Sequence, residues 1–182
     1  MNLEFHVEGD PHPLVIQYIN SFQWPNGEKR LKRKNTRAGL EASIMESWNA
    51  ADDRELGMMF EDDIEVSPLY FDYILLTLKN YLLGTPKNSD ALVGISLTTP
   101  RFNEVNIPHR MFLPDYYIGK QEKMYAHQLP CSWGAVYFPW EWRKFLEFYH
   151  WRKTKGPNEE LGTVPHGYVN LWRRSWKRYS FL

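Results

Sequence analysis

Apolar and polar positions along the chain follow two patterns. Short segments that alternate, or that are apolar throughout and bounded by turn residues, are typical of strands, whereas apolar residues three or four apart are typical of helices. Strands are expected at residues 3–7, 28–34, 58–60, 91–97 and within 129–138. Helices are expected at residues 14–22, 37–48, 69–83, 139–150 and 171–182. The alternation of strands with helices predicts an α/β fold with a mostly parallel sheet flanked by helices.

Two of these helices carry recognisable start signals. Asn35-Thr36 is a fair N-cap for the helix at 37–48. Ser67 is expected to cap the helix at 69–83, with Pro68 at its first position. Residues 103–128 are irregular and rich in Pro and Tyr, which indicates a long loop or a lid over a site.

Length and charge narrow the class of protein. A chain of 182 residues fits a single domain, residues 1–182. Lys+Arg and Asp+Glu are each 22, so a net charge of zero gives no global attraction to nucleic acid or membrane. The single cysteine, Cys131, excludes an intramolecular disulfide. Because no stretch approaches the roughly 20 apolar residues of a membrane span and the start lacks a signal-peptide layout, the chain as written is expected to be soluble.

Three consecutive carboxylates stand at the end of the apolar run 58–60. They are Glu61, Asp62 and Asp63, and Ile-Glu-Val-Ser-Pro follows them. Open α/β sheets bind ligands at the carboxyl ends of their strands. Because side chains alternate along a strand, we expect Asp62 to face away from Glu61 and Asp63.

Acids that share a face repel one another unless a cation, a basic cluster or water compensates their charge. We interpret this motif as a divalent-metal site, and its all-oxygen ligands favour a hard cation such as Mg²⁺ or Mn²⁺. Acidic triplets more often form solvated turns, but the apolar strand before this one and the apolar helix after it weaken that interpretation. No Cys/His cluster has the spacing of a zinc site, which argues against zinc.

Other chemistry-bearing residues have plainer interpretations. The basic run 29–34 is typical of a charged edge strand or solvated loop, and Arg37 after it is the better candidate to bind a phosphate or diphosphate. His127 and His166 fit surface residues, and Cys131 fits a small buried one. Most aromatic residues should lie in the core, although sugars stack on aromatic faces and one or two of five tryptophans could serve that purpose: Trp140, Trp142, Trp151, Trp172 and Trp176.

The acidic motif and its surroundings resemble GT-A glycosyltransferases. A strand, Glu-Asp-Asp, Ile-Glu-Val-Ser-Pro and an aromatic helix are especially similar to the Glu-Asp-Asp-hydrophobic-Glu-Val-x-Pro segment of the N-acetylglucosaminyltransferase I group. The similarity includes the earlier segment Arg-Lys-Asn-Thr-Arg-Ala-Gly-Leu at 33–40. Across residues 2–182 the chain resembles eukaryotic glycosyltransferase-2-like proteins that share Leu-Glu-Phe-His-Val, Glu-Asp-Asp-Ile-Glu-Val-Ser-Pro and Ser-Trp-Gly.

This resemblance implies a metal-dependent transfer of sugar from a nucleoside-diphosphate sugar, expected to be a uridine diphosphate sugar, to a hydroxyl of a carbohydrate or glycoconjugate acceptor. Mn²⁺ or Mg²⁺ is the implied cofactor. In the family the last acid of the motif binds the metal, which corresponds to Asp63, and Glu61 aligns with the first acid. The middle acid, Asp62, corresponds to the position that contacts the donor nucleotide or completes the metal environment. A divalent cation would stabilise the charge that develops on the departing diphosphate.

The chain also departs from the family pattern. A GT-A domain begins with a strand and helix that form much of the nucleotide pocket, and we expect this chain to lack them and to be truncated. Its C-terminal region has no carboxylate where the N-acetylglucosaminyltransferase I group has one, so the catalytic base is unknown. The substitutes are Glu104, Asp115, Glu141 and the pair at 159–160, although Glu141 equally fits an ordinary acid in a first helical turn.

Two rival functions follow from the same residues. A degenerate glycosyltransferase remnant would bind sugar or a partner protein without catalysis. A metal-dependent phosphohydrolase would use the same acids together with further Asp or His ligands. Family members often work in the secretory pathway behind an N-terminal anchor, which this chain does not carry, so a Golgi or ER location is expected only for an anchored full-length form.

Overall fold

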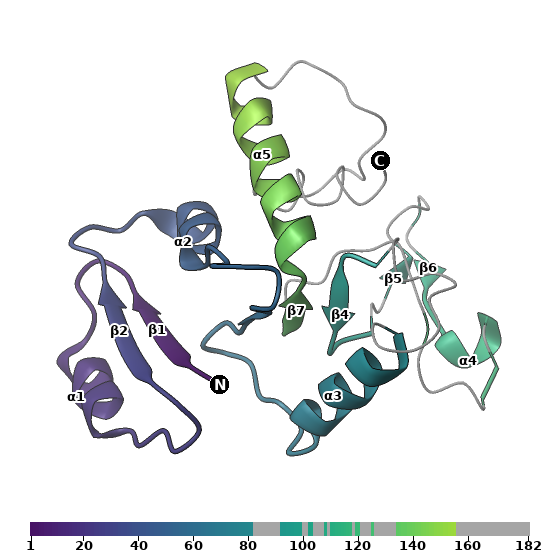
Figure 1. Ribbon diagram of the computed structural model, residues 1–182, viewed down its shortest axis with the longest axis horizontal. Helices are drawn as coiled ribbons and strands as arrows, with labels where there is room; N and C mark the ends of the chain where they lie inside the picture. Colours follow the sequence, from purple (N-terminus) through teal and green to yellow (C-terminus); the bar gives the residue numbers. More distant parts are fainter. Residues whose placement is uncertain are drawn as a thin grey trace. The chain divides into compact units, whose positions relative to one another are not determined.

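The computed structural model of the chain describes residues 1–81, 92–99, 102–103, 108, 110–117, 119–120, 125 and 134–155. These residues combine small sheets with helices (Figure 1), so the predicted mixture of strands and helices is confirmed. The chain divides into two compact units, Met1–Asn49 and Ala50–Leu182, and each is described by itself. None of the helices in the described ranges is long and apolar enough to cross a membrane. The helix expected at 171–182 lies outside the described residues.

The first unit is a strand–helix–strand followed by a second helix. β1 (Leu3–Val7) and β2 (Lys29–Arg33) pair in parallel, and α1 (Pro13–Ser21) connects them (Figure 1). α2 (Gly39–Ser47) follows β2. On one side of the strand pair, the ring of Phe5 meets the ring of Phe22 edge-on, with 5.9 Å between their centroids.

Lys29 closes the C-terminal end of α1. Its Nζ donates hydrogen bonds of 2.7, 3.2 and 2.8 Å to three main-chain oxygens, those of Ile19, Asn20 and Phe22. The last carbonyls of a helix have no partners within the helix, and their partial charge is negative. The ammonium group from β2 therefore satisfies these oxygens, and this member of the basic run serves the fold.

The start of α2 is capped from a distance. No side-chain cap comes from Ala38, the residue at the N-cap position, so the predicted cap at Asn35-Thr36 is wrong. Instead the carboxylate of Glu8, just after β1, accepts hydrogen bonds from the hydroxyl of Ser43 and from the main-chain N–H of Gly39, the latter at 3.1 Å. The Ser43 hydrogen bond, followed by that of Gly39, holds the pKa of Glu8 below its usual value against the opposing effect of desolvation.

The second unit contains a three-stranded sheet. Its order is β3–β7–β4, formed by Gly57–Met59, Ala135–Tyr137 and Gly94–Ser96. β7 is the central strand and runs antiparallel to both neighbours. β3 and β4 consequently run in the same direction without touching.

Three helices and a small strand pair complete the described part of this unit. α3 (Tyr70–Tyr81) follows β3, and α5 (Pro139–Lys155) follows β7. Between β4 and β7 the chain forms an antiparallel pair, β5 (Phe102–Asn103) and β6 (Arg110–Met111), and the short α4 (Pro114–Tyr117). The irregular region expected at 103–128 therefore holds short elements of its own.

The core of the second unit lies between the sheet and its helices. Ile74 of α3 packs with Ile95 of β4 and with Val136 and Phe138 at β7, and all four are buried. Three large side chains of α5 are also fully buried: Trp142, Phe145 and Tyr149. The apolar runs that predicted buried strands thus do mark the core.

Strand direction differs from the prediction. Among the described strands only β1 and β2 are parallel, and the other three pairings are antiparallel. The expected mostly parallel sheet is therefore not found in the described residues. A short apolar run indicates that a strand is buried but carries no information about its direction.

Candidate functional site

The acidic motif stands at one edge of the three-stranded sheet. Met59, the last residue of β3, and Ser96, the last residue of β4, are both paired with Ala135 at the start of β7. Because neighbouring strands lie about 4.8 Å apart, the ends of β3 and β4 are roughly 10 Å apart on either side of β7. The residues that follow the two strands therefore leave the sheet at the same edge.

The three acids form a turn rather than a continuation of β3. The strand ends at Met59, and the main-chain N–H of Ile64 donates to the carbonyl oxygen of Glu61 at 3.3 Å. Glu61 is half-buried, whereas Asp62 and Asp63 are exposed. The expected alternation of Asp62 against its neighbours is wrong because the chain reverses here before it can extend. The two exposed carboxylates are carried on the turn itself.

Ser67 organises the other end of this loop. Its hydroxyl accepts the main-chain N–H of Leu69 at 3.2 Å, and its carbonyl oxygen accepts that of Tyr70 at 3.0 Å. Ser67 therefore bonds the turn directly before α3, but α3 begins at Tyr70, so Pro68 is not the first helical residue as predicted. Both ends of the acidic loop are thus fixed by regular structure.

The segment after β4 faces the acidic turn across the start of β7. The hydroxyl of Ser96 donates to the carbonyl oxygen of Thr98 at 2.7 Å and accepts the main-chain N–H of the same residue at 3.1 Å. These two bonds tighten the chain directly after the strand. The main-chain N–H of Leu97 donates to the carbonyl oxygen of Gly134 at 3.0 Å, which joins this segment to the residue before β7.

The acidic turn by itself is not a complete metal site. In the part of the chain that the structure describes, no three or more His, Cys, Asp or Glu side chains are grouped as a complete metal site. Mg²⁺ is commonly held by one or two carboxylates together with waters and substrate phosphates. The exposed oxygens of Asp63 and Asp62 offer such a partial set.

Arg37, predicted to bind phosphate or diphosphate, belongs to the first unit. It is exposed, and its side chain lies against Gly9, where a Cβ atom would come within 2.6 Å of its Cγ. Gly9 has a positive φ of 55°, a conformation that favours glycine. The structure thus brings Arg37 to the turn after β1, within the first unit.

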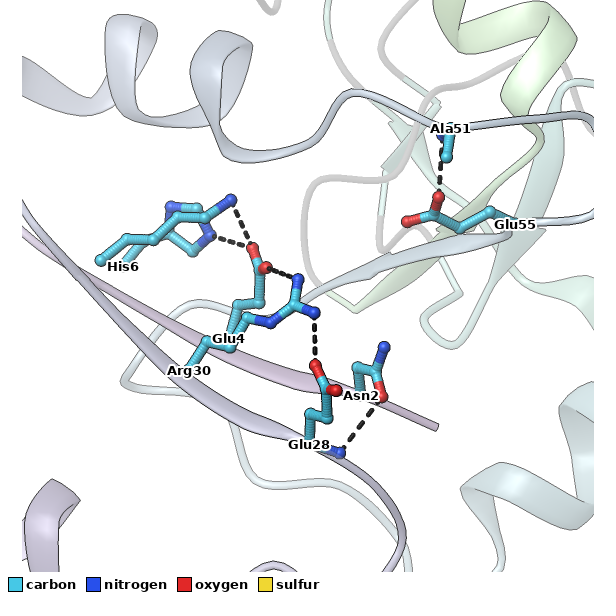
Figure 2. Close-up of polar contacts among 8 residues, drawn as sticks. Asn2, Glu4, His6, Glu28, Arg30, Ala51 and Glu55 are labelled. Atoms are coloured by element: carbon cyan, nitrogen blue, oxygen red, sulfur yellow. Dashed lines mark hydrogen bonds and ion pairs between the residues drawn. The ribbon is translucent and has the colours of Figure 1, made fainter.

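Two members of the basic run, Arg30 and Lys32, lie beside Glu4 and His6 on the β1–β2 pair. Figure 2 shows the carboxylate of Glu4 between His6 and Arg30, at 3.2 and 3.5 Å. The Nζ of Lys32 lies 2.7 Å from the same carboxylate and is the main cause of the lowered pKa of Glu4. Lys34 pairs with Glu46 of α2 at 2.9 Å. These ion pairs support the interpretation of the run as a charged strand.

The candidate bases differ in their surroundings. Glu141 is buried in the first turn of α5, and its carboxylate pairs with Lys144 at 2.8 Å. This pairing supports the ordinary helix role of Glu141. Asp115 lies exposed in α4. Glu104 lies outside the described residues, as do the acids at 159–160.

The aromatic residues are mostly structural where they are described. Trp142 is buried in the core, and Trp140 stacks on Phe138 at 5.2 Å between ring centroids. Trp151 is 41% exposed at the end of α5. The remaining candidates lie outside the described residues: His127, Cys131, His166, Trp172 and Trp176.

Sequence reasoning missed Phe60 and Gly134. Phe60 directly precedes the acids, and Gly134 precedes β7 at the same sheet edge. A Cβ atom on Gly134 would lie 3.2 Å from Cε1 of Phe60, and the φ of Gly134 is 68°. The glycine of the Ser-Trp-Gly segment was the signal, because a glycine beside a strand often marks a close approach.

Comparison with known proteins identifies a family, and the description of that family names no activity. No curated protein and no solved structure matches the chain. The family model described as "SPBC1E8.03c C-terminal domain" matches residues 2–158, which include every strand and helix described above. The chain therefore belongs to the SPBC1E8.03c C-terminal domain family.

Proposed function

We propose that the chain is a metal-dependent glycosyltransferase that moves a sugar from a nucleoside-diphosphate sugar to an acceptor hydroxyl. The observation that carries the proposal is the turn of acids at the end of β3, with Asp62 and Asp63 exposed at the sheet edge. The resemblance of the Glu-Asp-Asp segment to GT-A glycosyltransferases supports the same reading, and we infer a fold of that type with a uridine diphosphate sugar as donor.

The acids take different roles in this proposal. Asp63, with Glu61 beside it, would hold Mn²⁺ or Mg²⁺ together with the diphosphate, and Asp62 would contact the nucleotide side of the donor. When bound, the cation supplies positive charge where the departing diphosphate becomes more negative. Asp62 and Asp63 are consecutive exposed residues of the turn, where both would help to orient the donor diphosphate before transfer.

The acceptor hydroxyl requires a proton acceptor as it attacks the anomeric carbon, if the sugar is transferred with inversion. Among the candidates in the described residues, Asp115 is exposed and Glu141 is paired with Lys144. We therefore favour Asp115 over Glu141 for this role. A phosphohydrolase is disfavoured because the described residues hold no group of three converging ligands.

Binding of Mn²⁺ tests the metal site. The wild-type chain should bind one Mn²⁺ in a titration followed by electron paramagnetic resonance. Asp63→Ala should weaken Mn²⁺ binding at least about tenfold, because a tenfold change in affinity corresponds to a loss of about 1.4 kcal/mol. Asp72→Ala is the matched control, because Asp72 is also exposed but lies on α3. Equal affinity in wild type and Asp63→Ala would contradict the proposal.

A measurement of turnover distinguishes a glycosyltransferase from a binding module that does not catalyse transfer. With saturating Mn²⁺, release of uridine diphosphate from a panel of uridine diphosphate sugars should be measurable and should depend on Asp63. The engagement of Glu141 in an ion pair is the observation that favours the non-catalytic alternative. Mn²⁺ binding without release of nucleotide from any donor would support that alternative.

A further inference from the structure

Phe60 and Tyr70 stand at the two ends of the acidic loop. Phe60 follows the last residue of β3, and Tyr70 is the first residue of α3. Their rings meet edge to face, with centroids 5.8 Å apart and planes at 89°. Edge-to-face aromatic pairs of this kind are attractive beyond the area that they bury. The residues between them, 61–69, therefore form a loop that is closed by an aromatic contact.

The core and a glycine fix this aromatic pair in place. Tyr70 packs against the cluster that contains Ile74 and Val136. The ring of Phe60 lies over Gly134, where a Cβ atom would be 3.2 Å from Cε1 and 3.5 Å from Cδ1 of that ring. The missing side chain of Gly134 leaves the space that Phe60 occupies. Although Phe60 is 42% exposed, its position is thus defined on two sides.

The loop carries its own hydrogen bonds between these ends. The N–H groups of Ile64, Leu69 and Tyr70 are all bonded within it, the first to Glu61 and the other two to Ser67. Asp62 and Asp63 lie exposed at the turn. Closing a loop at its base reduces the number of conformations that its tip can adopt.

We propose that the Phe60–Tyr70 pair positions the acidic turn, so that both residues determine cation affinity without touching the cation. This inference rests on the proposed function for its ligand, but its structural part stands independently of any metal. Phe60 and Tyr70 are positioning residues, and the carboxylates remain the ligands. Loss of either ring should loosen the loop and should weaken Mn²⁺ binding together with it.

The experiment compares Phe60→Leu, Tyr70→Leu and the double variant in the full chain. Without metal, amide hydrogen exchange at Ile64 and Leu69 in each single variant, and at Tyr70 in Phe60→Leu, should accelerate by about two- to tenfold, the range expected for one aromatic pair. Mn²⁺ affinity, measured by electron paramagnetic resonance, should fall by a similar factor. The double variant should lose little more than either single variant, because both remove the same contact.

Two controls separate positioning from general loss of stability. Tyr70→Phe keeps the ring and should retain both wild-type exchange and wild-type Mn²⁺ affinity. Tyr18→Leu removes a ring that pairs with Phe22 at a similar 5.9 Å on α1, and it should leave the loop amides unchanged.

The outcomes distinguish this inference from the proposed function. Unchanged exchange at the three amides in Phe60→Leu would overturn the positioning role. Faster exchange with unchanged Mn²⁺ affinity would overturn its link to the cation. A wild-type chain that binds no Mn²⁺ would overturn both the proposed function and the effect of the aromatic pair on cation affinity. The exchange data would then test only whether the Phe60–Tyr70 pair holds the acidic loop in place.

Discussion

Carboxylates in this chain divide into those that the fold uses and those that it leaves exposed. Glu4 pairs with cations across two strands, Glu8 caps a helix, and Glu141 pairs with a lysine one turn away. Asp62 and Asp63 lie exposed on a turn at a sheet edge. A carboxylate that already serves the fold is a poor ligand or base, since recruiting it would leave its partners unsatisfied. Among the candidate residues that the structure describes, this distinction favours Asp62, Asp63 and Asp115 over Glu141.

The hydrogen bonds of Lys29 at the end of α1 can be tested by a single substitution. Lys29→Met keeps an unbranched side chain but removes the ammonium donor from three oxygens at the end of α1. We expect a loss of about 1–3 kcal/mol in the free energy of unfolding, the cost of leaving partly buried polar groups without a donor. Urea denaturation followed by circular dichroism measures this loss.

The neighbouring lysine is the control for that measurement. Lys32 lies on the same strand, and its side chain is 55% exposed where it pairs with Glu4. Since exposed ion pairs contribute at most about 1 kcal/mol, Lys32→Met should be the milder change. Equal losses for the two variants would contradict a special role of Lys29 at the helix end.

Between elements, the contact of Glu8 with α2 makes the first unit sensitive to acid. The pKa of Glu8 in the folded chain lies below its ordinary value of 4.5, first because of the hydrogen bond from Ser43. Folding therefore favours the carboxylate form. The stabilisation that Glu8 provides is complete above the unfolded pKa and is lost as the pH falls through the folded pKa.

Glu8→Gln tests this pH dependence. The free energy of unfolding of the wild type should decrease more steeply than that of the variant as the pH falls below 4.5, and the two curves should converge in acid. Ser43→Ala should have a pH profile similar to that of Glu8→Gln, because it removes the main cause of the pKa shift. Parallel curves for wild type and Glu8→Gln across this pH range would contradict the assignment.

Elements were predictable where a pattern is local. Strands β1, β2, β3, β4 and β7 each lie within a predicted strand segment or within one residue of it. The hydroxyl of Ser67 does bond the chain just before α3, although Pro68 is not the first helical residue. The cap of α2 was not predictable, because its carboxylate comes from Glu8, far away in sequence. The antiparallel direction of β7 was also not predictable from the sequence, because the direction of a strand depends on its partners rather than on its own composition.

The candidate site was predictable in residue type but not in shape. Glu61, Asp62 and Asp63 do stand at the end of a buried strand, as the apolar run before them indicated. Their arrangement in a turn depends on one main-chain hydrogen bond, from Ile64 to Glu61, that no side-chain pattern encodes. The contacts of Phe60 were not predictable because its partners, Tyr70 and Gly134, come together only through the fold.

For the whole molecule, zero net charge predicts weak resistance to self-association near neutral pH. Exposed apolar side chains such as Leu14 and Tyr116, 63% and 81% exposed, add attraction between copies. The second virial coefficient from static light scattering should be lowest near pH 7 and should rise toward about pH 9, where negative charge accumulates. Added salt at high pH should cancel the rise. A coefficient that is constant across this range would contradict the prediction.

The central place of β7 also has a consequence for biosynthesis. Met58 and Ile95 both find their strand partner in Val136, so β3 and β4 have no neighbour in this sheet until that residue has been made. At roughly 5–20 residues per second, a ribosome needs several seconds to travel from the acidic loop to this strand. During that interval the apolar strand before Glu61 is an open edge, and a nascent chain is then most exposed to chaperones and to aggregation.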